Sequence, residues 1–184
     1  MRRIEEFIGK DLIWEINKLS SDLMFKFIGG SLGKCKYELR FNNEVVAIFN
    51  KPQATSFFCI VETADTKWDI QFIGSAFSRE RKMSIKSEDS KLKDATVYPI
   101  GHIGRNPIIR LSGGDEFIVK SNLWGNSFSV VNQAGKTIIH FEKPSVFGGE
   151  KKLHIDPAVT EYPVLLIIAA YFIYAAIIYP AVSC

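Results

Sequence analysis

The sequence predicts a mainly β fold, a closed barrel of about twelve strands that encloses one hydrophobic C-terminal α-helix. Residues 21–155 alternate apolar and polar side chains, and turn residues recur about every ten positions, as in β-sandwiches and barrels. Residues 163–182 then contain no charged side chain, which is typical of a helix that is buried on every side. Side chains alone fill a barrel of about eight strands, whereas about sixteen strands enclose a channel. A closed sheet of about twelve strands therefore needs a filling, and the apolar segment supplies it.

The clearest strand is predicted over residues 34–41. Four apolar residues alternate there with four charged residues, so that one face of the strand is buried and the other is solvated. Asn42 and Asn43 then offer a tight turn into a second strand over residues 44–49. The other expected strands cover residues 23–28, 56–62, 68–77, 79–86, 92–98, 107–111, 116–121, 127–132, 136–142 and 151–155.

The first twenty residues predict a short amphipathic helix. Apolar side chains recur there at helical spacing, and both signs of charge lie between them. We interpret residues 1–20 as a helix docked on a single domain that spans residues 21–184. The apolar residues of the pattern are Ile4, Phe7, Ile8, Leu12, Ile16 and Leu19.

The apolar tail allows two interpretations, a central helix or a membrane span. Pro163 fits the first turn of a helix and Pro180 ends it, which leaves the 17 residues 163–179. At 1.5 Å per residue this helix is about 25 Å long, shorter than the hydrocarbon core of a bilayer, which is about 30 Å thick. Tyr171 and Tyr174 lie near its middle, whereas membrane spans carry tyrosines at their ends. These features favour a buried central helix. The alternative is a tail-anchored membrane protein with a cytoplasmic β interaction domain.

Composition narrows the class of protein. The 184 residues carry 23 Lys and Arg against 20 Asp and Glu, a net charge of +3, which is too mild for a nucleic-acid-binding protein. Three cysteines that are far apart predict neither a disulfide framework nor a zinc site, and they favour a reducing compartment. Acidic residues interrupt the N-terminus, so it does not resemble a secretory signal. We therefore expect a cytoplasmic location.

Signals of catalysis are weak in this sequence. Residues 29–34 resemble a phosphate loop but lack its first glycine and its Ser or Thr. His102, His140 and His154 are widely separated, and His140 alternates with apolar neighbours as an outward strand residue would. No nucleophile-elbow pattern is present. We expect a protein that is not an enzyme and that holds no metal and no cofactor.

The order of many strands followed by one apolar helix resembles the Tubby C-terminal-like superfamily, which includes tubby domains, phospholipid scramblases and plant LURP-one-related proteins. The resemblance extends from about residue 23 to the C-terminus. It rests on that order, on WGNSFSVVNQAGKTIIHFEK at residues 124–143 and on LLIIAAYFIYAAII at residues 165–178. It implies a twelve-stranded barrel threaded by a hydrophobic C-terminal helix.

The resemblance also implies binding at a membrane surface rather than catalysis. Tubby domains bind phosphoinositide headgroups through basic side chains two apart on a strand, and Arg79 and Arg81 have this spacing. Together with Lys82 and Lys86 they are our candidates for contact with an anionic phospholipid headgroup. A protein partner at the inner membrane surface is the other expected partner. Alternatively, these residues only mark the solvated rim of the barrel.

Overall fold

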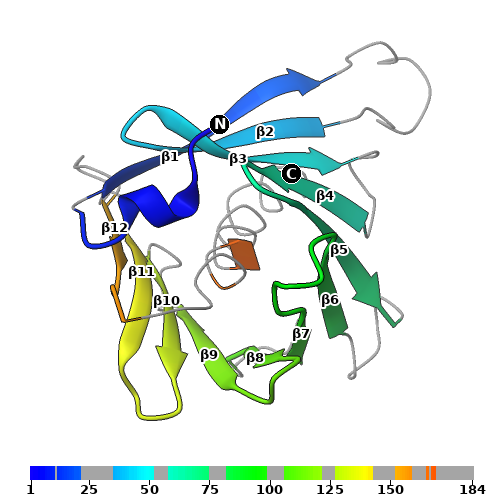
Figure 1. Cartoon of the computed structure of the whole chain (residues 1–184), viewed down its shortest axis with the longest axis vertical. Helices are drawn as coiled ribbons and strands as arrows, with labels where there is room; N and C mark the ends of the chain where they lie inside the picture. Colours follow the sequence, from blue (N-terminus) through cyan, green and yellow to red (C-terminus); the bar gives the residue numbers. More distant parts are fainter. Residues whose placement is uncertain are drawn as a thin grey trace, which may run out of the picture.

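The computed structural model describes residues 1–10, 12–21, 35–51, 58–74, 82–98, 106–121, 127–142, 152–158, 165 and 167–168. Within these residues twelve strands form one closed antiparallel barrel (Figure 1). Each strand pairs with its neighbours in sequence, and the last strand pairs with the first. A short 3-10 helix, η1 (Ile4–Phe7), precedes the strands. The strands are β1 (Leu12–Ser21), β2 (Cys35–Phe41), β3 (Glu44–Lys51), β4 (Phe58–Thr63), β5 (Lys67–Ile73), β6 (Lys82–Ser87), β7 (Ala95–Tyr98), β8 (Ile108–Leu111), β9 (Glu116–Ser121), β10 (Ser127–Asn132), β11 (Thr137–Glu142) and β12 (Lys152–Ile155).

The expected closed barrel is confirmed, and the expected strands from residues 34–41 to residues 151–155 coincide with β2 to β12 apart from differences at their ends. The tight turn at Asn42 and Asn43 is confirmed as well. Both residues have positive φ, 48° and 67°, the conformation that two-residue hairpin turns require. The strand expected over residues 23–28 lies outside the described residues.

The amphipathic helix predicted for residues 1–20 is wrong. The chain forms only the single turn η1, Gly9 takes a positive φ of 68°, and β1 begins at Leu12. Leu12 and Trp14 are buried while Ile13 between them is 40% exposed, which is the alternation of a strand. Pairing with β2 on one side and β12 on the other satisfies the backbone of β1 and closes the barrel. Tertiary pairing therefore overrides the helical spacing, and the barrel begins at β1 rather than at residue 21.

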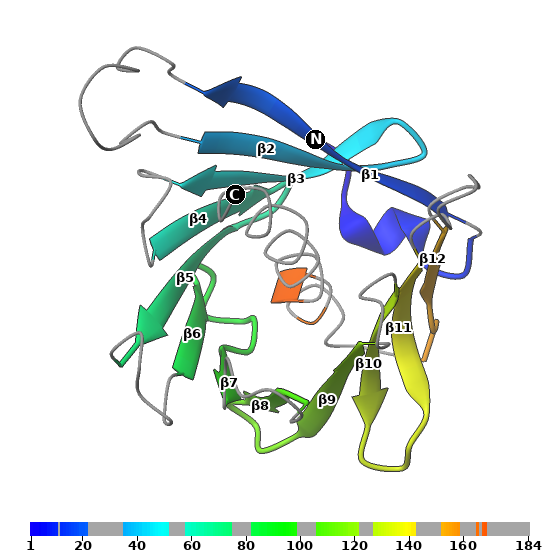
Figure 2. The same cartoon turned by 180° about the vertical axis from the view of Figure 1, so that it is seen from behind.

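The inward faces of the strands form one hydrophobic core. Trp14 packs edge to face on Phe141 with ring centroids 5.5 Å apart, and its Nε1 donates a hydrogen bond to the Glu142 carbonyl at 2.8 Å. Leu165, Ile167 and Ile168 are helical, have 0% exposure and belong to this core. Figure 1 shows their orange segment in the middle of the ring of strands, and Figure 2 shows the same from behind. The rest of the predicted helix over residues 163–179 lies outside the described residues.

The two ends of the barrel are defined by the connections between strands. Turns at residues 42–43, 64–66, 88–94, 112–115 and 133–136 join even-numbered strands to the next strand. Because neighbouring strands are antiparallel, all five turns lie at one end, which we call the turn end. The opposite ends of the strands lie at the other end of the barrel, which we call the far end. They include Ser21 of β1, Cys35 of β2, Glu142 of β11 and Lys152 of β12. None of the helices in the described part of the chain has the length and apolarity needed to cross a bilayer.

The turn end is covered by η1. The N–H of Arg2 donates a hydrogen bond to the Val45 carbonyl at 2.9 Å, which fixes the N-terminus beside the β2–β3 turn. Ile4 and Phe7 are 3% and 5% exposed, and the Phe7 ring packs edge to face on Phe41 at 5.6 Å. The residues expected to form a docked helix therefore close one mouth of the barrel with a single turn.

Candidate binding surface

Two of the four residues proposed to bind a headgroup lie on β6, and their position follows from strand alternation. Lys82 and Lys86 are exposed, whereas Met83 and Ile85 between them are fully buried in the core. The lysines therefore project from the outer wall of the barrel. Arg79 and Arg81 lie outside the described residues.

The cross-strand neighbours of the two lysines differ. Lys82 lies opposite Ile73, the last residue of β5, which is 52% exposed. Lys86 lies opposite Asp69, toward the turn end. Within the part of the chain that the structure describes, neither lysine forms an ion pair or a side-chain hydrogen bond. The far-end part of this wall therefore combines a lysine and an exposed isoleucine.

The structure separates the lysines that follow in sequence from this wall. Lys91 and Lys93 belong to the β6–β7 turn at the turn end. The Lys93 Nζ pairs with Asp115 Oδ2 at 3.0 Å, and the Lys91 N–H donates to Asp89 Oδ1 at 2.9 Å. Of the four lysines between residues 82 and 93, only Lys82 and Lys86 therefore lie on β6.

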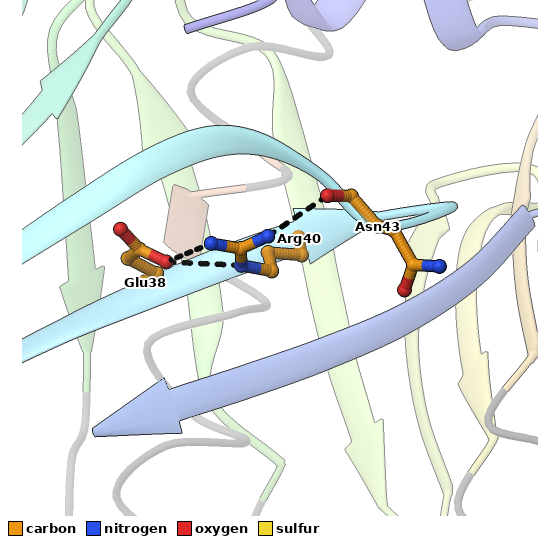
Figure 3. A network of polar contacts seen from close by, with 3 residues as sticks. All are labelled: Glu38, Arg40 and Asn43. Carbon is orange, nitrogen blue, oxygen red and sulfur yellow. Dashed lines mark hydrogen bonds and ion pairs between the residues drawn. The ribbon is translucent and has the colours of Figure 1, made fainter. Parts of the chain in front are cut away.

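Two arginines of the outer wall, Arg40 and Arg110, are held by carboxylates. Figure 3 shows Arg40 on β2 donating from Nε and Nη2 to Glu38 Oε2, at 2.9 and 2.7 Å, and from Nη1 to the Asn43 carbonyl at 2.9 Å. Three of its donors are thereby used to fix the β2–β3 hairpin. Sequence reasoning missed this network, although the alternation of residues 34–41 placed both charged side chains on one face.

Arg110 on β8 is held in a similar way. Its guanidinium lies over the Tyr98 ring at 5.1 Å and pairs with Glu116 at 2.5 Å. The hydrogen bond to Glu116 raises the pKa of Arg110 above its ordinary value, so this cation stays charged and paired. Arg40 and Arg110 are thus poor candidates for ligand contacts.

A polar network on β10 and β11 was also missed. Ser129 Oγ lies 2.7 Å from His140 Nδ1, and His140 Nε2 lies 3.2 Å from Glu142 Oε1. His140 is an outward strand residue, as predicted. The register places His154 on β12 directly opposite His140, although the two histidines are separated in sequence. Both histidines lie at outward positions of neighbouring strands, and the alternation of apolar and polar residues in the sequence already indicates these positions.

Asp156 ends β12 and is held by three contacts. Its Oδ2 pairs with Lys136 at 2.5 Å, its Oδ1 accepts from the Ala158 N–H at 2.9 Å, and its own N–H donates to the Ile138 carbonyl at 2.8 Å. The hydrogen bond from Lys136 and that from Ala158 lower the pKa of Asp156. This carboxylate anchors the chain where it leaves the barrel wall for the core.

Comparisons with known proteins add no functional assignment. In the described part of the chain, no three His, Cys, Asp or Glu side chains lie close enough to hold a metal ion. A scan against protein-family models finds no matching family, and searches of curated proteins and of solved structures find no significant match.

Proposed function

We propose that the protein is a non-enzymatic binding module of the Tubby C-terminal-like type that docks on anionic phospholipid headgroups through the outer wall of β5 and β6. The observation that carries the proposal is the exposure of Lys82 and Lys86 without a carboxylate partner among the described residues. Six other cations of the described part do have such partners: Arg2, Arg3, Arg40, Lys93, Arg110 and Lys136.

The proposed fold includes a helix over residues 163–179 that threads the barrel. Complete burial of Leu165, Ile167 and Ile168 in the same core as the strands supports this arrangement. A tail anchor would place those side chains in lipid and would leave the barrel interior without them. Membrane contact is therefore assigned to the outside of the barrel, and the location is peripheral at the cytoplasmic face of a membrane.

Co-sedimentation with vesicles tests the proposal. The protein should sediment with vesicles that contain phosphatidylserine or phosphoinositide and should stay in the supernatant with phosphatidylcholine alone. Each lysine near an anionic surface contributes about 1 kcal/mol, so the Lys82→Gln, Lys86→Gln double variant should bind about 30-fold more weakly. Lys91→Gln, the loss of an exposed lysine at the turn end, is the matched control and should bind almost as well as the unchanged protein.

Three outcomes would count against the proposal. Equal sedimentation with neutral and anionic vesicles would contradict headgroup recognition, and an equal loss in the Lys91→Gln control would contradict the assignment to β6. A protein that binds none of these vesicles would also contradict docking on phospholipid headgroups.

A further inference from the structure

Four polar side chains form a single row across the outer wall of β9 to β12. The strand register places Lys120 opposite Ser129, Ser129 opposite His140, and His140 opposite His154. Neighbouring strands are about 4.8 Å apart, so the row is about 15 Å long. Lys120 and His154 are exposed, and Ser129 and His140 are half-buried. We propose that this row is an acid-dependent binding site for a phosphate group.

The hydrogen bonds of His140 show how acid would switch the site. An ionised carboxylate only accepts hydrogen bonds, so the contact of Glu142 with Nε2 places a proton on that nitrogen. In the neutral imidazole Nδ1 is then an acceptor, and the Ser129 hydroxyl donates to it across 2.7 Å. While the imidazole of His140 is neutral, the hydroxyl proton of Ser129 is therefore engaged within the protein.

Protonation of His140 reverses this hydrogen bond. Both ring nitrogens then donate, Ser129 Oγ becomes the acceptor for Nδ1, and the hydroxyl proton is released to donate elsewhere. Acid thus adds a positive charge and a hydrogen-bond donor at the same point of the row.

The charged groups around His140 favour an anion once the histidines are protonated. Glu142 lies two residues away on β11, and Lys152 lies two residues from His154 on β12. Asp156, directly after β12, is paired with Lys136. On β10 the neighbours Ser127 and Ser129 carry no charge, and on β9 the row ends with Lys120. Among the described residues, the four cationic side chains then lie near two carboxylates, Glu142, which is 52% exposed and holds His140, and Asp156, whose charge interacts with His154 as well as with Lys136. A tetrahedral oxyanion with several acceptor oxygens matches this set of donors.

The row lies on a different wall from the proposed headgroup site. Figure 1 shows β5 and β6 on the right of the ring and β10 to β12 on the left. One flat membrane cannot contact both walls at once, so this site is assigned to a phosphate group on a soluble molecule. Its existence does not depend on the proposed membrane docking.

Binding of sulfate tests the site. Sulfate is a tetrahedral dianion at both pH 5.5 and pH 8, so any change in its affinity between these pH values comes from the protein. Amide chemical shifts, recorded at constant ionic strength set with chloride, should locate binding at Ser129, His140 and His154. Affinity should be at least tenfold higher at pH 5.5 than at pH 8. Inorganic phosphate at pH 5.5 should perturb the same amides.

Three variants test the roles of the histidines, of Ser129 and of the β6 lysines separately. The His140→Gln, His154→Gln double variant should lose the pH dependence, and Ser129→Ala should weaken binding at pH 5.5 about threefold while keeping it pH-dependent. The Lys82→Gln, Lys86→Gln variant should bind sulfate unchanged even where it has lost vesicle binding. Equal affinity at the two pH values, or unchanged pH dependence in the histidine variant with a native amide spectrum, would overturn the proposal.

Discussion

The two ends of the barrel differ in how their described side chains are engaged. At the far end of β5 and β6, Lys82 and Ile73 lie opposite each other, and both side chains are exposed. At the turn end, cations find carboxylates on neighbouring segments, as the Arg3–Asp65 and Lys93–Asp115 pairs illustrate. The comparison shows that the turn end is stabilised by contacts between its own segments, whereas Lys82 and Ile73 at the far end of β5 and β6 are exposed to solvent.

Among single substitutions, the largest effect on stability should come from opening the closed end of the barrel. Phe7→Ala removes a ring that is 5% exposed and packed on Phe41, and such a change costs about 3–5 kcal/mol. Ile73→Ala at the far end removes a side chain that is 52% exposed and should change stability by no more than about 0.5 kcal/mol. Urea denaturation of both variants measures the difference. Equal losses would contradict the packing of η1 into the mouth of the barrel.

An intermediate and pH-dependent effect is expected at Asp156. Its pKa lies below the ordinary value of 3.8 in the folded protein, so the carboxylate contributes stability at neutral pH that is lost as the pH falls through the folded pKa. Asp156→Asn should lower the urea midpoint at pH 7, and the gap between the two proteins should narrow as the pH falls below about 4. A gap that is constant from pH 7 to pH 2.5 would show that the charge of Asp156 contributes nothing.

The smallest effect should come from a single surface pair at the turn end. Arg3 Nε and Asp65 Oδ1 are 2.9 Å apart, and both side chains are well exposed. Exposed ion pairs of this kind contribute about 0.2–1 kcal/mol, and salt weakens them. A double-mutant cycle with Arg3→Ala and Asp65→Ala, repeated in 1 M salt, measures the coupling. A coupling that is insensitive to salt would show that the pair acts through packing.

Most of the barrel could be predicted from sequence because its strands alternate clearly and its turns carry Asn or Gly. β1 could not, because residues 12–19 fit both a helical and a strand period. Pairing with β2 and with β12, about 140 residues away, decides between them. Local spacing is therefore an insufficient guide where one segment closes a barrel.

The candidate sites could be predicted only in part. The exposure of Lys82 and Lys86 followed from alternation, but the pairing of Lys93 with Asp115 depends on which turns share an end of the barrel. The alignment of Ser129 with His140 depends on strand register, which a bulge between Val130 and Val131 shifts within the same hairpin. Register is set by long-range pairing and by such bulges, so the row across β9 to β12 is visible only in the folded chain.

The central claim is that the apolar C-terminal segment is the core of the barrel, and truncation after Tyr162 tests it most directly. Three of the removed side chains, Leu165, Ile167 and Ile168, are fully buried; together they contribute roughly 5–9 kcal/mol, comparable with the whole stability of a domain, about 5–15 kcal/mol. We predict that the truncated protein has no cooperative unfolding transition in circular dichroism and is poorly soluble. A truncated protein that is folded, cooperative and more soluble than the full chain would contradict the claim and would identify the segment as a membrane anchor.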